Sequence, residues 1–476
     1  MKRSNSTRST NRPRLPAPAQ ANRLCSRRQF LRQTAAAAAA ASLFPTLIPA
    51  AALGKDGRPA PGNRIVIGCI GTGQQGRGDL GNFLNQKDAQ VVVVCDVKTD
   101  QADQARALVN QRYQNQDCST LKDFRELVAR QDIDAVLIAT PDHWHVLAAL
   151  AAVRAGKDVY LEKPLGLRLE EDWALRREVR RQQRVFQFGT QQRSSRIFRL
   201  ACELVRNGRI GKLTHINVWA PGSAPGGSTE IIPPPADLDY DFWLGPAPFQ
   251  PYTRNLVSSD FNQRTWYYQS HYTLGFITGW GIHPLDIAAW GAGESLDGRL
   301  EVLGRGSFQA AGVCDTALVW DVRFKAESGL TMRFLGVPNG GNHNDTWPGD
   351  EFRQRYRRIT THGTAFEGTD GWVHVDRDGI NLQPENLIDA EPTGFKVHLI
   401  NSPDHTRNFL DCVKSRAQTV CPIDEAVRSD TLCHLAETAV RLNRGVVWDT
   451  KKERFIDDPE ANLRLEGYRM RGAWRI

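Results

Sequence analysis

Apolar runs alternate regularly with amphipathic segments over residues 62–190. Four runs rich in Val, Ile and Leu predict buried strands: IVIGCI (65–70), QVVVVCDV (90–97), DAVLIAT (134–140) and KDVYLEKP (157–164). Helical patterns occupy the segments between them: 99–113, 123–130 and 145–156. Strands separated by helices of this length predict a parallel, doubly wound sheet. Further along, 402–416 and 422–445 predict two amphipathic helices that we interpret as structural.

A glycine-rich turn, GTGQQG, follows the first predicted strand. Gly71 permits a tight turn, Gly73 lets the backbone approach a pyrophosphate, and Gly76 allows close helix–strand packing. Asp96 ends the second strand, twenty residues beyond Gly76, where a carboxylate binds a ribose. The segment therefore predicts a dinucleotide site. Asp96 would repel a 2′-phosphate and favours NAD over NADP, although Lys98 weakens this preference.

Two further loops, TPDHWH (140–145) and EKP (162–164), follow predicted strands. Ligands of doubly wound sheets bind at the carboxyl ends of the strands, so we expect both loops to border the cofactor. The residues that we expect to bind it are Gly71, Gly73, Gln74, Gln75, Gly76, Asp96, Thr140, Pro141, His145, Glu162 and Lys163.

The first 54 residues predict an export signal and linker. A basic region is followed by a short apolar segment and by PAAALG, which is typical of a cleavable signal peptide. SRRQFLR (26–32) resembles the twin-arginine motif, which directs folded proteins across the bacterial inner membrane. We therefore expect the twin-arginine export machinery as a partner and a periplasmic location. Membrane anchoring by an uncleaved signal is the lesser alternative, and a disordered tail is a further one.

The charge is unevenly distributed along the 476 residues. The formal net charge is +8, but residues 1–34 contain nine Lys and Arg and no acidic residue, so the remainder is close to neutral. We therefore expect no nucleic-acid partner. The nine cysteines form no CxxC pair, and a chain that folds in the reducing cytoplasm needs no disulfide. Cys412 and Cys421 are the pair left open.

The motifs in this order resemble the glucose–fructose oxidoreductase/inositol dehydrogenase (Gfo/Idh/MocA) family, in its exported branch. Beyond the glycine turn, the resemblance rests on ATPDHWH, YLEKPL, FGTQQRSS (188–195), DYDFWLGPAP (239–248), GWGIHPLDIAAWG (279–291), NFLDCVKSR and GVVWDTKKERF. It implies a Rossmann domain over 62–190 and an α/β domain over 191–445 with an open, largely antiparallel sheet. It also implies a homo-oligomer, dimer or tetramer, and we expect 446–476 to be a tail packed on the body.

Lys163 and His283 are the candidate catalytic residues. Oxidation of an alcohol needs a cation at the reacting oxygen and a base for its proton. The resemblance implies that Lys163 of the EKP loop supplies the cation, that the Lys163–Pro164 peptide is cis, and that Glu162 is structural. His283 is the candidate acid/base, and Asp286 lies on the same helical face. Inositol dehydrogenase-like members carry Asp four residues before this histidine, whereas this chain has Gly279, so the proton route stays open.

Four residues are candidates for binding substrate: Asp286, Arg193, His145 and His271. Arg193 could instead form an ordinary salt bridge, and His145 could cap or pack a helix. The aromatic residues around His271 (266–272) could stack on a sugar or belong to a core. The pair His143 and His145 lacks further ligands nearby, so we expect no metal there. The polar loop 341–352 is equally compatible with sugar binding and disorder.

The leading hypothesis is an NAD-dependent oxidoreductase that transfers hydride between a polyhydroxylated substrate, such as a sugar, glycoside or inositol, and a tightly bound nicotinamide. Some relatives are glycosidases that oxidise a sugar transiently and later return the hydride. A redox-neutral glycosidase is therefore the alternative. A non-catalytic sugar-binding protein is a third possibility, against which Lys163 and His283 argue.

Overall fold

The computed structural model describes residues 61–476, apart from 259, 261–262, 310–311, 339–348, 358, 390–393 and 467–468. The predicted signal segment, 1–54, lies outside the described residues. So does most of the polar loop 341–352, of which the last four residues belong to helix α11 (Gly349–Tyr356).

A six-stranded parallel sheet forms the first part of the described chain, in the order β3-β2-β1-β4-β5-β6. Its strands are β1 (Ile65–Ile70), β2 (Ala89–Cys95), β3 (Ser119–Leu121), β4 (Ala135–Ile138), β5 (Asp158–Leu161) and β6 (Phe186–Phe188). β4 and β5 are buried at every position, as expected for strands covered on both faces. The predicted doubly wound sheet is confirmed.

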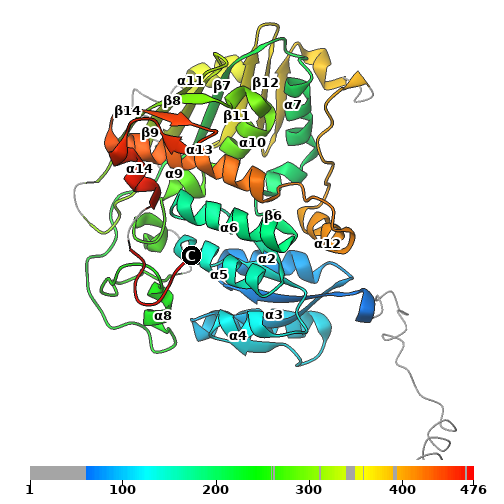
Figure 1. Cartoon of the computed structure of the whole chain (residues 1–476), viewed down its shortest axis with the longest axis vertical. Coiled ribbons are helices and arrows are strands. Elements are labelled where there is room, and N and C mark those ends of the chain that lie inside the picture. Colours follow the sequence, from blue (N-terminus) through cyan, green and yellow to red (C-terminus); the bar gives the residue numbers. More distant parts are fainter. Residues whose placement is uncertain are drawn as a thin grey trace, which may run out of the picture. The chain divides into compact units, whose positions relative to one another are not determined.

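Helices follow the strands of this sheet in alternation (Figure 1). They are α2 (Gln74–Leu84), α3 (Thr99–Tyr113), α4 (Phe124–Ala129), α5 (Asp142–Arg154) and α6 (Leu169–Gln182), and the short helix η2 (Pro61–Asn63) precedes β1. The change of direction in strand order falls between β1 and β4, so the carboxyl ends of these two strands flank a crevice.

A second, nine-stranded sheet has the order β13-β12-β11-β7-β10-β9-β8-β14-β15 and is antiparallel except between β7 and β10. Its strands are β7 (Leu213–Pro221), β8 (Arg299–Ser307), β9 (Val319–Ala326), β10 (Thr331–Val337), β11 (Gly363–Gly368), β12 (Trp372–Asp376), β13 (Gly379–Gln383), β14 (Gly445–Asp449) and β15 (Arg454–Phe455). The expected mostly antiparallel sheet is thus present.

Helices α7 (Arg196–Arg206), α10 (Ile282–Ala292) and α13 (Ile423–Leu442) cover one face of the second sheet (Figure 1). Side chains of β8 alternate between exposed and buried along its first six residues, so the opposite face is open. The other elements are α8 (Tyr240–Leu244), α9 (Phe276–Gly279), α12 (His405–Ser415), α14 (Pro459–Glu466), η3 (Gln191–Ser194), η5 (Trp266–Tyr268), η6 (Gly293–Leu296) and η7 (Glu385–Asp389).

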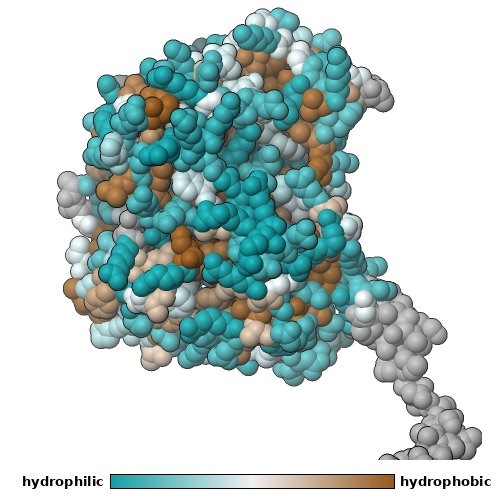
Figure 2. Space-filling view, viewed as in Figure 1, coloured by the Kyte–Doolittle hydropathy of each residue, from teal (hydrophilic) through white to brown (hydrophobic). Residues whose placement is uncertain are grey.

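The segment 446–476, which we expected as a tail packed on the body, contributes most of β14 and all of β15 to this sheet. The eight cysteines of the described part are free and buried, so Cys412 and Cys421 are not bonded to each other. Within the described residues, no helix combines the length and apolarity that a membrane crossing requires. Hydrophilic residues predominate on the face drawn in Figure 2, and hydrophobic residues form small separate patches.

Candidate active site

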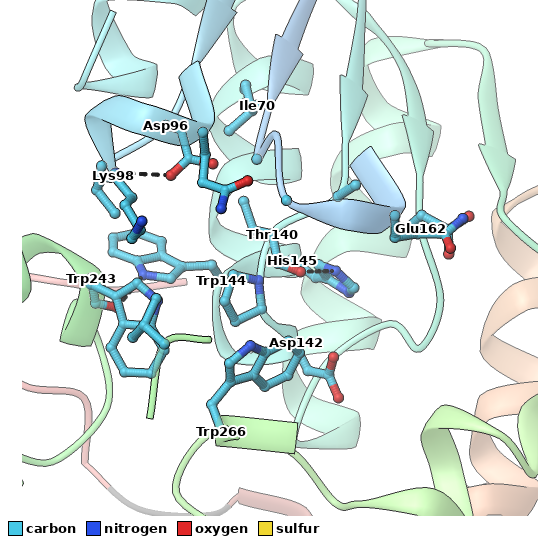
Figure 3. A pocket seen from close by; sticks show the side chains of 18 of the residues that line it. Ile70, Asp96, Lys98, Thr140, Asp142, Trp144, His145, Glu162, Trp243 and Trp266 are labelled. Atoms are coloured by element: carbon cyan, nitrogen blue, oxygen red, sulfur yellow. Dashed lines mark hydrogen bonds between the residues drawn. The ribbon is translucent and has the colours of Figure 1, made fainter. Parts of the chain in front are cut away.

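A cavity of about 430 Å³ lies at the carboxyl ends of β1, β2, β4 and β5. The loops after these strands form one wall, and residues from α8 to α9 of the second domain form the other (Figure 3). The expected cofactor residues that line it are Gly71, Gly73, Gln74, Gln75, Asp96, Thr140, Pro141, His145, Glu162 and Lys163. Gly76 lies behind this wall. The second domain contributes Phe242, Trp243, Val257, Ser258, Trp266, Tyr267, Phe276 and Trp280.

The three glycines of the turn have different surroundings. Gly71 has φ 81°, and a Cβ there would lie 2.5 Å from the Ala139 carbonyl oxygen. A Cβ on Gly76 would lie 2.2 Å from the Gly71 oxygen, which accounts for its packing role. A Cβ on Gly73 would meet nothing within 4 Å, and Gly73 lines the cavity as the N-cap of α2 without a side-chain cap. The start of α2 is thus open to a diphosphate.

Asp96 is held at the end of β2 by the glycine turn. Its Oδ2 accepts hydrogen bonds from the Thr72 backbone N–H, at 2.8 Å, and from the Thr72 hydroxyl, at 3.2 Å. Its Oδ1 accepts from the Lys98 N–H at 2.9 Å. Burial raises the pKa of Asp96. A carboxylate in this place fits the ribose hydroxyls of NAD, and the chain's residues therefore fit the cofactor.

Lys163 extends from the loop after β5 to the second domain. Its Nζ donates to the carbonyl oxygen of Gly279, at 3.2 Å, and the Lys163–Pro164 peptide is cis, as expected. Glu162 is buried behind it and accepts from the Gln191 side chain at 2.7 Å. The expected cation is therefore in the cavity wall, at the junction of the two domains.

His145 connects the two loops that border the cavity. Its Nδ1 lies 2.6 Å from the Pro164 carbonyl oxygen and its Nε2 lies 2.8 Å from the Thr140 carbonyl oxygen. Burial lowers the pKa of His145 to about 4, so the imidazole is neutral and donates to one carbonyl at a time. The ring is 1% exposed and fastens the EKP loop to the start of α5, so it positions Lys163.

Asp142 and Tyr267 line the cavity and lie in two segments that the sequence singles out, 140–145 and 266–272, but neither residue was predicted individually. Asp142, the first residue of α5, accepts from the Thr273 hydroxyl at 2.7 Å, and burial raises its pKa to about 7. Tyr267 occupies the space beside Gly279, because a Cβ built on Gly279 would lie 1.8 Å from the tyrosine oxygen. The spacing from His283 revealed the missing aspartate but not the phenol that takes its place.

His283 lies behind the lining residues of the cavity. Its ring centroid is 6.1 Å from that of Trp280, which does line the cavity. Burial, followed by the charges of Lys163 and Arg377, lowers the pKa of His283 well below its usual value. The imidazole is therefore neutral, and its surroundings oppose the gain of a proton.

Arg193 and Asp286, two of the candidates for binding substrate, form a buried ion pair with each other. The two side chains are 1% and 0% exposed, and Nη2 of Arg193 lies 2.7 Å from Oδ1 of Asp286. Asp286 also accepts from the Ser429 hydroxyl at 2.7 Å, and Arg193 stacks over Trp290. The buried pair joins η3 to α10 and α13, so it has a structural role.

His271, a further candidate for binding substrate, forms a hydrogen bond within the protein. His271 does not line the cavity, and its Nε2 accepts from the Gln250 side chain at 3.0 Å. His143 has Nε2 at 3.0 Å from the Trp243 carbonyl oxygen, and its ring packs against Trp243 and Tyr272. These contacts make His143 part of an aromatic core.

Sequence profiles of one protein family match both domains. The profile described as an oxidoreductase family NAD-binding Rossmann fold matches residues 65–190. The profile described as the C-terminal alpha/beta domain of the same family matches 219–294 and 392–476. Together these ranges span more than half of the chain. The chain belongs to the Gfo/Idh/MocA oxidoreductase family.

Curated relatives match part of this chain. A glycosyl hydrolase family 109 protein of Shewanella sp. (strain W3-18-1) is 30% identical over 207 residues, which cover 40% of this chain and 44% of the relative. An alpha-N-acetylgalactosaminidase of Shewanella oneidensis is 31% identical over 160 residues, which cover 33% of this chain and 35% of the relative. The matches thus span less than half the length of these relatives.

Solved structures share the fold over most of the chain. Scyllo-inositol dehydrogenase of Lactobacillus casei, solved with NAD(H) and scyllo-inositol, has a TM-score of 0.54 at 18% identity, covering 81% of this chain and 99% of its own. The WlbA dehydrogenase of Bordetella pertussis, solved with NADH and UDP-GlcNAcA, has a TM-score of 0.58 at 16% identity, covering 80% and 98%.

Proposed function

We propose that this protein is an NAD-dependent oxidoreductase that transfers hydride between a CH–OH group of a polyhydroxylated substrate and a tightly held NAD. The observation that carries the proposal is the position of Lys163. Its ammonium group lies in the same cavity as the glycine turn and Asp96, and it reaches the second domain at Gly279. A cation there can bind the reacting oxygen beside the cofactor.

The roles of the residues follow from their charges. Lys163 donates to the substrate hydroxyl and stabilises negative charge that develops on its oxygen. Asp142 lies within the field of Lys163 and takes the proton, because a pKa of about 7 suits a general base. NAD, when bound, would accept the hydride. The aromatic side chains of Trp266, Tyr267 and Trp280 line the cavity and can pack against C–H groups of a sugar ring.

The test is a panel of sugars, glycosides and inositols added to purified protein that retains its NAD. We expect at least one polyol to produce the absorbance of reduced nicotinamide on the enzyme. Lys163→Met should lower turnover by about two to three orders of magnitude and leave NAD affinity nearly intact. If no compound of the panel produces reduced nicotinamide, the proposal is refuted. Unchanged turnover in Lys163→Met would show that Lys163 takes no part in the reaction.

Redox-neutral glycoside cleavage is a second candidate function, favoured by the glycosyl hydrolase family 109 relatives. The same Lys163 and Asp142 would serve a transient oxidation, elimination of the aglycone, addition of water to the resulting double bond and return of the hydride. An aryl glycoside separates the two functions: the glycosidase releases the phenol without net formation of NADH. The dehydrogenase accumulates reduced nicotinamide and releases no phenol.

We further propose that the protein is exported with NAD already bound and acts in the periplasm as a homo-oligomer. Retention of NAD is supported by the segment that follows residue 236, which lies across the end of β2. The Thr99 N–H donates to the Asp237 oxygen at 2.9 Å, and the Lys98 ammonium lies 3.3 Å from the Asp237 carboxylate. The open face of the nine-stranded sheet would pair with a second copy.

A further inference from the structure

Three ionisable side chains outside the cavity lining converge between α6 and α13. Asp172 lies in the first turn of α6, and Asp430 and His434 are one turn apart on α13. One ligand atom of each lies within 4.8 Å of the other two. Both aspartates are 0% exposed and the histidine is 5% exposed. Two carboxylates and an imidazole are thus enclosed together in the interior.

Most polar atoms that face one another in this cluster lack a hydrogen-bond partner. This holds for Oδ2 of Asp172, both carboxylate oxygens of Asp430, and Nε2 of His434. The histidine Nε2 lies 3.3 Å from Oδ2 of Asp430 and 3.8 Å from Oδ2 of Asp172. Buried polar groups are almost always paired, and an uncompensated buried carboxylate is strongly unfavourable. The cluster therefore needs a positive charge or a shared proton.

The separations of these atoms match those of metal ligands. Bonds of about 2.1 Å hold adjacent ligands of a tetrahedral ion about 3.4 Å apart and opposite ligands of an octahedral ion about 4.2 Å apart. The two distances from the imidazole nitrogen fall in or beside this range. A mixed oxygen and nitrogen set suits the divalent ions of the first transition row, including Zn²⁺ and Mn²⁺, better than Mg²⁺ or Ca²⁺.

We propose that Asp172, Asp430 and His434 bind a divalent transition-metal ion that joins the two domains. Three protein ligands leave at least one coordination position for water. No sequence motif marks this set, because Asp172 lies more than 250 residues before Asp430.

The ion would act on the active site through the backbone. Oδ1 of Asp172 accepts a hydrogen bond from the Gly166 N–H at 2.9 Å, three residues after Lys163. A Cβ on Gly166 would lie 2.9 Å from the same oxygen, so the loop is closely apposed to the carboxylate. Figure 1 shows α13 above α6, and the two helices pack together. An ion between them would fix the EKP loop against the second domain, so its role is positioning.

The first experiment measures metal in the untagged, full-length protein by mass spectrometry. We expect about one zinc or manganese ion per chain. After removal by a chelator, Zn²⁺ or Mn²⁺ in hundredfold excess over Kd should raise Tm by about 3 °C. A wild-type protein that contains no metal and whose Tm does not respond to either ion would overturn the proposal. The cluster would then hold a shared proton.

The second experiment tests the ligands. Asp430→Asn and His434→Gln keep the side-chain size and should each lower metal affinity at least tenfold. Asp424→Asn is the matched control, since Asp424 lies on the same helix but forms an exposed pair with Arg180. The control should retain the metal. Full metal content in both cluster variants would place the ion elsewhere and refute the assignment. The wild-type titration stands even if a variant fails to fold.

Discussion

At the scale of single residues, Gly279 and Tyr267 are complementary in shape. The tyrosine oxygen fills the space that any side chain at position 279 would enter, 1.8 Å from a built Cβ. We predict that Gly279→Ala lowers the free energy of unfolding by about 1–3 kcal/mol through overpacking. Gly81→Ala in α2 is the control, because its Cβ meets nothing within 4 Å and should stabilise the helix by about 0.5–1 kcal/mol.

A double-mutant cycle with Tyr267→Ala decides whether the clash is the cause. Urea denaturation should show that Gly279→Ala costs much less free energy in the Tyr267→Ala background than in the wild type. Additive losses in the two single variants would mean that the side chains do not compete for this space.

The proposed role of Asp142 as general base predicts a pH dependence near neutrality. Its carboxylate must be ionised to take a proton, and burial raises its pKa to about 7. We predict that kcat/KM rises about tenfold per pH unit below pH 7 and levels off above it. Asp142→Asn should remove this rising limb and lower turnover, whereas His283→Gln should keep the limb. If only His283→Gln loses this rise of kcat/KM with pH, His283 is the general base and Asp142 is not.

The same shift has a consequence for stability. An aspartate with a pKa raised above its unfolded value of about 3.9 binds more protons in the folded state between pH 4 and 7. Its contribution to the free energy of unfolding is complete below pH 4 and is lost as the pH rises through 7. In Asp142→Asn this part of the pH dependence should be absent from urea denaturation curves.

At the scale of elements, the Arg193–Asp286 pair holds η3 against α10 and α13. We predict that Arg193→Met costs about 3–5 kcal/mol of unfolding free energy, because Asp286 then stays buried without a countercharge. Replacing both, Arg193→Met with Asp286→Leu, should recover much of this loss. Arg180→Met removes an exposed pair with Asp424 and should cost less than about 1 kcal/mol. A raised KM with unchanged stability in Arg193→Met would restore its proposed contact with substrate.

The elements that sequence predicts well are those whose signal is local. The strand at 65–70 and the helix at 99–113 agree with β1 and α3, since periodicity and the glycine turn lie within one segment. The contacts of Arg193, His271 and Tyr267 depend on partners about 10 to 95 residues away, which no local pattern encodes. Arg193 and His271 were therefore predicted to bind substrate, although both side chains are held by contacts within the protein.

At the scale of the whole molecule, the first and second domains enclose the cofactor cavity between them. The side chains of α8 reach it, and Trp474 near the C-terminus stacks on Phe242 with centroids 5.8 Å apart and packs edge-on to Trp144 at 4.7 Å. These contacts hold the C-terminal segment against Phe242 and Trp144, two of the residues that line the cavity. Such enclosure slows dissociation, which suits an enzyme that does not exchange its nicotinamide.

The proposed export in a folded state depends on retention of NAD. A periplasmic enzyme has no expected supply of free nicotinamide, so NAD bound before export would have to remain bound. We predict that wild-type protein from the periplasm releases about one NAD per chain on denaturation. Arg27→Lys with Arg28→Lys should keep the protein in the cytoplasm, whereas Arg3→Lys with Arg8→Lys should not.

Lys98→Ala, which removes the ion pair with Asp237, should speed NAD loss in dialysis. Periplasmic protein with empty sites and weak NAD affinity would contradict this account, because the reaction would then need a cofactor that the compartment does not provide.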